Sequence, residues 1–126
     1  MKRTIKFRAQ RLDNGKWVCG DLEHNPGNKL TRIHTYDSKG DYQGQHIVIP
    51  ESVCQFTGLL DRNGKEIYEG DILTCPEDVD FLPETVIFKE GCFMAKDDYT
   101  TIAMNAIDTD YRNITGNIYD NPELLK

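Results

Sequence analysis

The stretch that decides the fold class lies near the N-terminus, at residues 4–21, and reads TIKFRAQRLDNGKWVCGD. In its first half, isoleucine, phenylalanine and alanine alternate with polar residues. A two-residue period is typical of a β-strand with one buried face. The Asp13-Asn14-Gly15 step tolerates the positive φ that a hairpin turn requires. The stretch therefore predicts a β-hairpin whose return strand covers residues 16–21.

Similar patterns recur along the rest of the chain. Further strands are predicted at residues 29–35, 45–49, 53–57, 65–68, 72–75, 85–89, 92–95 and 113–119. Short strands separated by turns roughly every 8–12 residues favour a mostly β fold, either a small barrel or a sandwich.

Two segments depart from this pattern. Residues 23–50 are the most polar part of the chain; residues 23–28 are predicted to form a loop, and the region is expected to be a mobile flap rather than core. At the other end, Asn121 suits a helix cap and Pro122 the first helical position. A short C-terminal helix is therefore expected.

Length and composition narrow the class of protein. A chain of 126 residues with 38% hydrophobic residues suits one domain with its own core. The sequence has no apolar run of about 18 residues, so we expect no membrane association. Because the charged N-terminus lacks the apolar segment of a secretory signal, a cytoplasmic location is expected.

The four cysteines stand singly, at positions 19, 54, 75 and 92, with no Cys-x-x-Cys pair. Structural zinc usually takes ligands that cluster two to four residues apart, so reduced, small hydrophobic side chains are the better interpretation. Glycine-rich phosphate loops and the Gly-x-Ser-x-Gly nucleophile motif are absent from the sequence. We therefore predict no cofactor, no metal and no catalytic residue.

Charge is unevenly distributed along the chain. The net charge is −6, yet residues 1–12 hold five basic residues and no acidic one. Since an acidic body disfavours general nucleic-acid binding, the candidate contacts with nucleic acid or a partner are confined to Lys2, Lys6, Arg8 and Trp17. Two other interpretations stay open: these charges protect an edge strand from aggregation, or they pair with the acidic body.

Histidines and carboxylates offer weaker candidates. A small enzyme site among His34, His46 and Cys54 is conceivable, but nothing in their spacing fixes a geometry, and surface histidines are the simpler interpretation. Carboxylates two residues apart occur in residues 77–80 and 108–110. They lack the glycine and closing glutamate of a calcium loop, so solvated loops are expected there.

Three segments resemble one family. They are IKFRA at residues 5–9, FTGLLDRNGKEIYEGDI at residues 56–72 and GNIYDNPELL at residues 116–125. In this order they are similar to the YopX family of phages and prophages. The resemblance implies an all-β fold with an SH3-like barrel in the C-terminal half, and it implies no activity. Physically, the glycines of the central segment suit turns or bulges, so the motif more simply specifies a barrel corner than a binding site.

The sequence thus predicts one mostly β domain over residues 1–126, with an N-terminal β region at 1–50 and an SH3-like barrel core at 51–126. The favoured function is a non-enzymatic binding or interaction module. Nucleic-acid binding through the basic N-terminal strand is the alternative, and a small enzyme with a His/Cys site is the second alternative. The expected partners are a host protein, nucleic acid or a second copy of the chain, because the basic strand of one copy can meet the acidic body of another.

Overall fold

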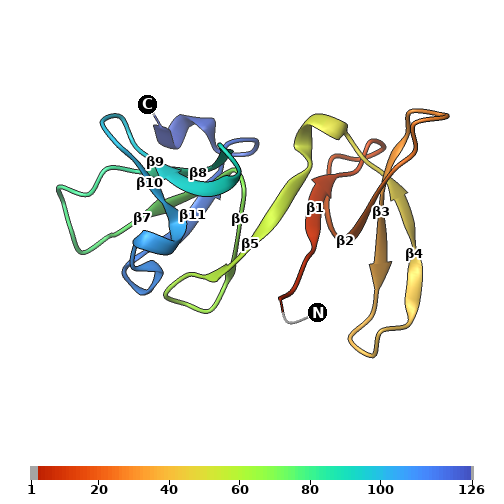
Figure 1. The fold of residues 1–126 in the computed structure, drawn as a ribbon, viewed down its shortest axis with the longest axis horizontal. Coiled ribbons are helices and arrows are strands. Elements are labelled where there is room, and N and C mark those ends of the chain that lie inside the picture. The colour runs from red at the N-terminus through yellow and green to blue at the C-terminus, as the bar shows by residue number, and fades with distance from the viewer. Residues whose placement is uncertain (1–2, 126) are drawn as a thin grey trace. The chain divides into compact units, whose positions relative to one another are not determined.

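The computed structural model describes residues 3–125, which form strands and short 3-10 helices. These residues fall into two compact units divided between Phe56 and Thr57 (Figure 1). We call residues 3–56 the first unit and residues 57–125 the second unit. The mostly β prediction is confirmed by two antiparallel sheets.

The first unit is an antiparallel meander. Strands β1 to β4 follow one another in the sheet, and β5 pairs with the free edge of β1, so that the sheet has the order β4-β3-β2-β1-β5-β6. The elements are β1 (Phe7–Gln10), β2 (Trp17–His24), β3 (Thr31–Tyr36), β4 (Tyr42–Ile47), a 3-10 helix (Pro50–Ser52) and the start of β5 (Cys54–Leu60). Strand β5 crosses the division, so β6 (Glu66–Tyr68) belongs to the second unit.

The core of the first unit corrects the expectation of a mobile flap. Ile33 is fully buried and Val48 is 2% exposed, and both pack with Ala9 from β1. Strand β2 also continues through Glu23 to His24, where a loop is predicted. Residues 23–50 look polar in the sequence because alternate positions of β2, β3 and β4 face away from this core.

The end of β4 returns to β1 and fixes the curl of the first sheet. An isolated bridge joins Arg11 to Val48. The Leu12 N–H donates to the Ile47 carbonyl at 3.0 Å, and the Ile49 N–H donates to the Gln10 carbonyl at 2.8 Å. The hairpin turn after β1 is therefore tied to the end of β4.

The second unit contains a five-stranded sheet with the order β10-β9-β8-β7-β11. Its elements are β7 (Asp71–Thr74), β8 (Glu84–Lys89), β9 (Cys92–Lys96), β10 (Thr101–Ala103), two 3-10 helices (Met104–Ala106 and Thr109–Tyr111), β11 (Asn113–Asn117) and a last 3-10 helix (Pro122–Leu125). Buried side chains of Ile67, Leu73, Val86, Ala95 and Met104 form its core.

The barrel prediction needs correction. Among residues 3–125 neither sheet closes: the first ends in the edge strands β4 and β6, and the second in β10 and β11. Strand β10 has only three residues before the chain turns into a 3-10 helix, and β11 shifts register between Ile114 and Gly116. Where a short C-terminal helix is predicted, Pro122–Leu125 form a single 3-10 turn.

The central family-like segment has a structural role in the second unit. Asp61 is 3% exposed, and its carboxylate accepts backbone N–H groups from Asn63, Lys65 and Ile114 at 2.8–3.0 Å. The N–H of Tyr68 donates to the buried carboxylate of Asp71 at 2.8 Å. These carboxylates hold turns and join separate strands, as expected of a corner in a small β fold.

Candidate functional site

The candidate site is the side of the first sheet that faces away from its core, which we call the outer face. Because Ala9, Val18 and Ile33 pack into the core, the alternate positions of β1, β2 and β3 lie on the opposite side. Cross-strand pairing aligns these positions, as with Arg8 opposite Cys19. The outer face carries Lys6, Arg8, Trp17, Glu23, Arg32 and His34.

The basic strand meets aromatic rings on this face. The guanidinium carbon of Arg8 lies 5.0 Å from the Trp17 ring centroid, and the Lys6 ammonium lies 5.7 Å from that of Phe56. Such cation–π contacts are worth about 0.5–1 kcal/mol at exposed sites. The structure thus gathers three predicted residues, Lys6, Arg8 and Trp17, on one face; Lys2 lies outside the described residues.

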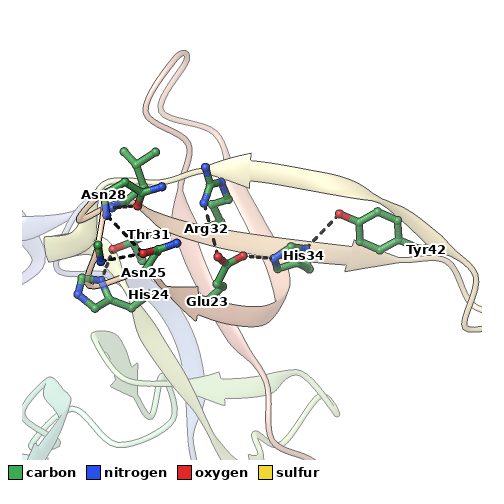
Figure 2. A network of polar contacts seen from close by, with 10 residues as sticks. Glu23, His24, Asn25, Asn28, Thr31, Arg32, His34 and Tyr42 are labelled. Atoms are coloured by element: carbon green, nitrogen blue, oxygen red, sulfur yellow. Dashed lines mark hydrogen bonds and ion pairs between the residues drawn. The ribbon is translucent and has the colours of Figure 1, made fainter.

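A polar network follows the same face toward β4 (Figure 2). One carboxylate oxygen of Glu23 lies 2.7 Å from His34 Nε2, and the other lies 3.5 Å from the Arg32 guanidinium. On the far side of the imidazole, His34 Nδ1 lies 3.1 Å from the Tyr42 hydroxyl. The network therefore joins β2, β3 and β4 through side chains.

The chemistry of this network follows from its donors. Nε2–H of His34 donates to the Glu23 carboxylate, and in the neutral imidazole Nδ1 accepts the Tyr42 hydroxyl proton. The hydrogen bond from His34 lowers the pKa of Glu23 below 4.5; burial opposes this shift and the Arg32 charge assists it. A carboxylate-oriented imidazole beside a hydroxyl resembles an activated nucleophile. Here Tyr42 is 53% exposed and its ring packs edge-on against Tyr36. The network therefore orients aromatic rings on an open surface.

A second set of hydrogen bonds fixes the turn that follows β2 (Figure 2). His24 Nδ1 lies 3.1 Å from the Thr31 hydroxyl, and Asn25 Oδ1 accepts the Gly27 N–H at 2.8 Å. The Leu30 N–H donates to Asn28 Oδ1 at 2.9 Å. These bonds fix the ends of β2 and β3, which explains why a Pro-Gly turn lies between two ordered strands.

The hypothetical His/Cys site is not assembled. His34 is opposite Gln45, whereas His46 is opposite Ile33, so the two imidazoles lie on different sides of the sheet. Cys54 is buried, with its Sγ 3.2 Å from the Ser52 carbonyl. Sequence reasoning missed the true neighbours of His34, because these depend on the register between β2, β3 and β4.

The acidic pairs act as turn caps. Asp78 accepts the N–H of Asp80, and Asp108 accepts the N–H of Asp110, each at 3.0 Å. Within residues 3–125, no three His, Cys, Asp or Glu side chains are grouped in a way that could hold a metal ion.

A groove in the first unit was also missed by sequence reasoning. It has a volume of about 400 Å³ and is lined by Arg11, Leu12, Asp13, Gln45, His46 and Ile47. We call this the Leu12 groove. Its walls come from the first hairpin turn and the end of β4, which the curl of the sheet brings together. A leucine next to an Asp-Asn-Gly turn is the one signal in the sequence that could have indicated it.

The two units carry opposite charge. Residues 1–56 hold nine basic and six acidic residues, a net charge of +3. Residues 57–126 hold six basic and fifteen acidic residues, a net charge of −9. Attraction to an anionic partner is therefore concentrated in the first unit.

In the part of the chain that the structure describes, no helix has the length and apolar character needed to cross a membrane.

Comparisons with known proteins agree with the fold. The chain matches the sequence profile of a family described as YopX protein over residues 6–126. It is also similar to the crystal structure of protein EF1440 from Enterococcus faecalis, with 26% sequence identity and a TM-score of 0.65. That alignment covers 99% of this chain and 100% of the other. No functionally curated protein matches the chain.

Proposed function

The chain belongs to the YopX family, and we propose that it is a non-enzymatic binding module that recognises an acidic partner protein through the outer face of its first unit. The observation that carries this proposal is the pair of cations held over rings, Arg8 over Trp17 and Lys6 over Phe56. The partner class follows from the net charge of +3 in this unit.

The geometry suits carboxylates because the cations are already ordered. A side chain that is fixed before binding loses less conformational freedom when the partner arrives. Guanidinium groups such as Arg8 also bind carboxylates in a bidentate manner. The Glu23–His34–Tyr42 network extends the same face with exposed tyrosine rings, and tyrosine is enriched at protein interfaces.

Nucleic-acid binding is the second candidate, since phosphates attract the same cations. One observation limits it: Phe56 is only 7% exposed, and Arg8 already lies over Trp17. The faces of these two rings are already in contact with cations. Single-stranded nucleic acid is usually bound by rings on which its bases stack. Contacts on this face with nucleic acid are therefore expected to be ionic and strongly dependent on salt.

A pull-down from bacterial lysate, with and without nuclease, tests the proposal. The test variant is Lys6→Glu with Arg8→Glu. The matched control is Lys29→Glu with Lys39→Glu, which makes the same charge change at exposed positions of the same unit. A protein retained after nuclease treatment by the wild type and the control, and lost by the test variant, is the expected result.

Other outcomes separate the candidates. Recovery of nucleic acid that disappears with nuclease, and that the test variant abolishes, favours the second candidate. Equal retention of every species by the wild type and the test variant would exclude the outer face as the binding surface.

The proposal also includes the arrangement of the second unit, the origin of the gene, the location of the protein and its domain organisation. The family resemblance supports an SH3-like arrangement in the second unit, a phage or prophage origin and a cytoplasmic location in a bacterial host. It also supports one functional domain over residues 1–126. An experimental structure tests the first feature, and the genes that flank close relatives test the second.

A further inference from the structure

We propose that the chain self-associates head to tail, with Val79 of one copy seated in the Leu12 groove of the next. This inference goes beyond the proposed function, because it uses the first hairpin turn and the end of β4 in place of the cations of β1, and it needs no other partner. It also names the two surfaces that meet, the Leu12 groove and the acidic loop at residues 76–83.

The Leu12 groove is preformed and apolar where it is most open. Leu12 is 62% exposed and Ile47 is 40% exposed. The hydrogen bond from the Leu12 N–H to the Ile47 carbonyl and the bridge from Arg11 to Val48 fix the two walls. A volume of about 400 Å³ lies at the small end of the range of about 300–1,000 Å³ for ligand pockets. The groove therefore accepts one or two side chains.

The charges in the wall cancel. The Arg11 guanidinium lies 2.7 Å from one Asp13 carboxylate oxygen and 3.0 Å from the other. The groove itself therefore favours an apolar side chain. Attraction for an acidic segment comes from the first unit as a whole, with its net charge of +3.

Val79 has the matching chemistry. It is 95% exposed, the highest value among the exposed large hydrophobic side chains of residues 3–125. Asp78 precedes it and Asp80 follows it. An apolar side chain between two carboxylates complements an apolar groove on a basic unit.

The acidic loop holds Val79 in a fixed position. The Asp78 N–H donates to the Cys75 carbonyl and the Phe81 N–H donates to the Asp78 carbonyl, each at 3.1 Å. Glu77 forms an ion pair with Arg62 at 2.6 Å. Because the loop is ordered before association, little conformational freedom is lost when Val79 enters the groove.

The two surfaces differ, so the contact is heterologous. Each copy then keeps one unused groove and one unused loop, and association continues into a ring or a filament. Opposite net charges on the two units strengthen the contact, and salt weakens it because the Debye length is about 8 Å at physiological ionic strength.

Sedimentation velocity on the full chain at low salt, over a concentration series, tests the proposal. Val79→Asp and Leu12→Asp are each expected to raise the dissociation constant at least tenfold, on the order of a central interface residue. Tyr99→Asp and Asn14→Asp are matched controls, because they add the same charge at exposed positions outside the loop and the apolar wall. The controls are expected to associate like the wild type.

An equal mixture of the two test variants makes the test specific. The Val79→Asp chain keeps an intact groove and the Leu12→Asp chain keeps an intact loop, so the mixture is expected to stop at a one-to-one dimer. Serine at the same two positions, which adds no charge, is expected to act in the same direction, and circular dichroism checks that each variant is folded.

Three results would overturn the inference. They are a wild-type chain that stays monomeric at every concentration, test variants that associate like the controls, and a mixture of folded test variants that forms no dimer. Lys6→Glu with Arg8→Glu changes no residue of the groove or the loop, but it changes the net charge of the first unit from +3 to −1. Its self-association is therefore compared with that of Lys29→Glu with Lys39→Glu, which makes the same charge change. Equal self-association of these two variants, with loss of the partner protein by the first alone, shows that this inference and the proposed function stand or fail separately.

Discussion

In the first unit, the basic side chains of β1 and the residue before it lie on the outer face of a sheet. In the second unit, by contrast, several carboxylates are buried and accept hydrogen bonds from the backbone or from arginine. Arg8 and Lys6 rest on aromatic rings at the surface of the first unit. In the second unit, Asp61 and Glu84 are 3% and 6% exposed. The Glu84 carboxylate is bound by both nitrogens of the Arg112 fork, at 2.6 and 3.1 Å.

The difference shows that net charge alone does not identify a binding surface. The second unit has the larger charge, −9, yet part of it belongs to carboxylates that serve turns and ion pairs. The first unit has only +3, but Lys6 and Arg8 are held over aromatic rings and remain partly exposed. Each of the following substitutions therefore changes one unit. Trp17 is the one tryptophan of the chain, so its fluorescence reports the unfolding of the first unit.

The largest effect is expected for Asp61→Ala. Three backbone N–H groups lose a charged acceptor. Hydrogen bonds to charged groups contribute about 1.5–3 kcal/mol each, so the free energy of unfolding should fall by at least about 3 kcal/mol. Urea denaturation followed by far-ultraviolet circular dichroism measures the loss. Asp110→Ala, at an exposed position, is the control and should change little.

Trp17 fluorescence in the same experiment sharpens the comparison. We expect the fluorescence transition to move less than the circular dichroism transition, since Asp61 belongs to the second unit. Equal shifts in both signals would mean that the two units unfold as one cooperative domain.

A smaller effect is expected for Gly20→Ala in β2. A Cβ at this position would lie 2.0 Å from the backbone carbonyl oxygen of His34, which cannot move without shifting β3. Overpacking of this kind costs about 1–3 kcal/mol. The Trp17 transition should move first, because the strain lies in the first unit. Gly27→Ala is the control, because its Cβ would meet only the Asn25 side chain, at 3.1 Å, and no backbone atom. An equal loss in both variants would contradict the role of the close approach.

The smallest effect is expected for His34→Gln. Since the hydrogen bond from His34 is the largest cause of the lowered pKa of Glu23, the substitution should raise that pKa toward 4.5. A carboxylate with a lowered pKa stabilises the fold above pH of about 4.5, and this contribution is lost as the pH falls through its folded pKa. Carboxyl carbon chemical shifts measure the titration. His24→Gln is the control, because His24 contacts Thr31, and the same rise there would remove His34 as the cause.

Much of the fold follows from alternation in the sequence. The hairpin at residues 4–21 appears as β1 and β2, and Lys6, Arg8 and Trp17 share a face as a two-residue period requires. Strand β2 runs past its predicted end because Leu22 packs with Ile33 in the core. That pairing joins distant residues, so local composition could not reveal it.

The candidate surfaces were harder to predict. The Glu23–His34–Tyr42 network requires the register of three strands. The Leu12 groove requires the curl that brings the first hairpin turn to the end of β4. Both depend on pairings between strands that are separated by turns of uncertain length, and a single sequence does not determine such registers.

Strand β5 has a consequence for how the protein is made. Its first residues pair with β1, at Gln55 opposite Phe7 and Cys54 opposite Arg8, and its later residues lie beside β6. Strands β1 to β4 are neighbours in the chain, so they can pair as they leave the ribosome. The edge of β1 that pairs with β5 stays unpaired until β5 has been translated. Synthesis of this single strand completes the pairing of β1 and supplies the strand beside which β6, the first strand of the second unit, is added.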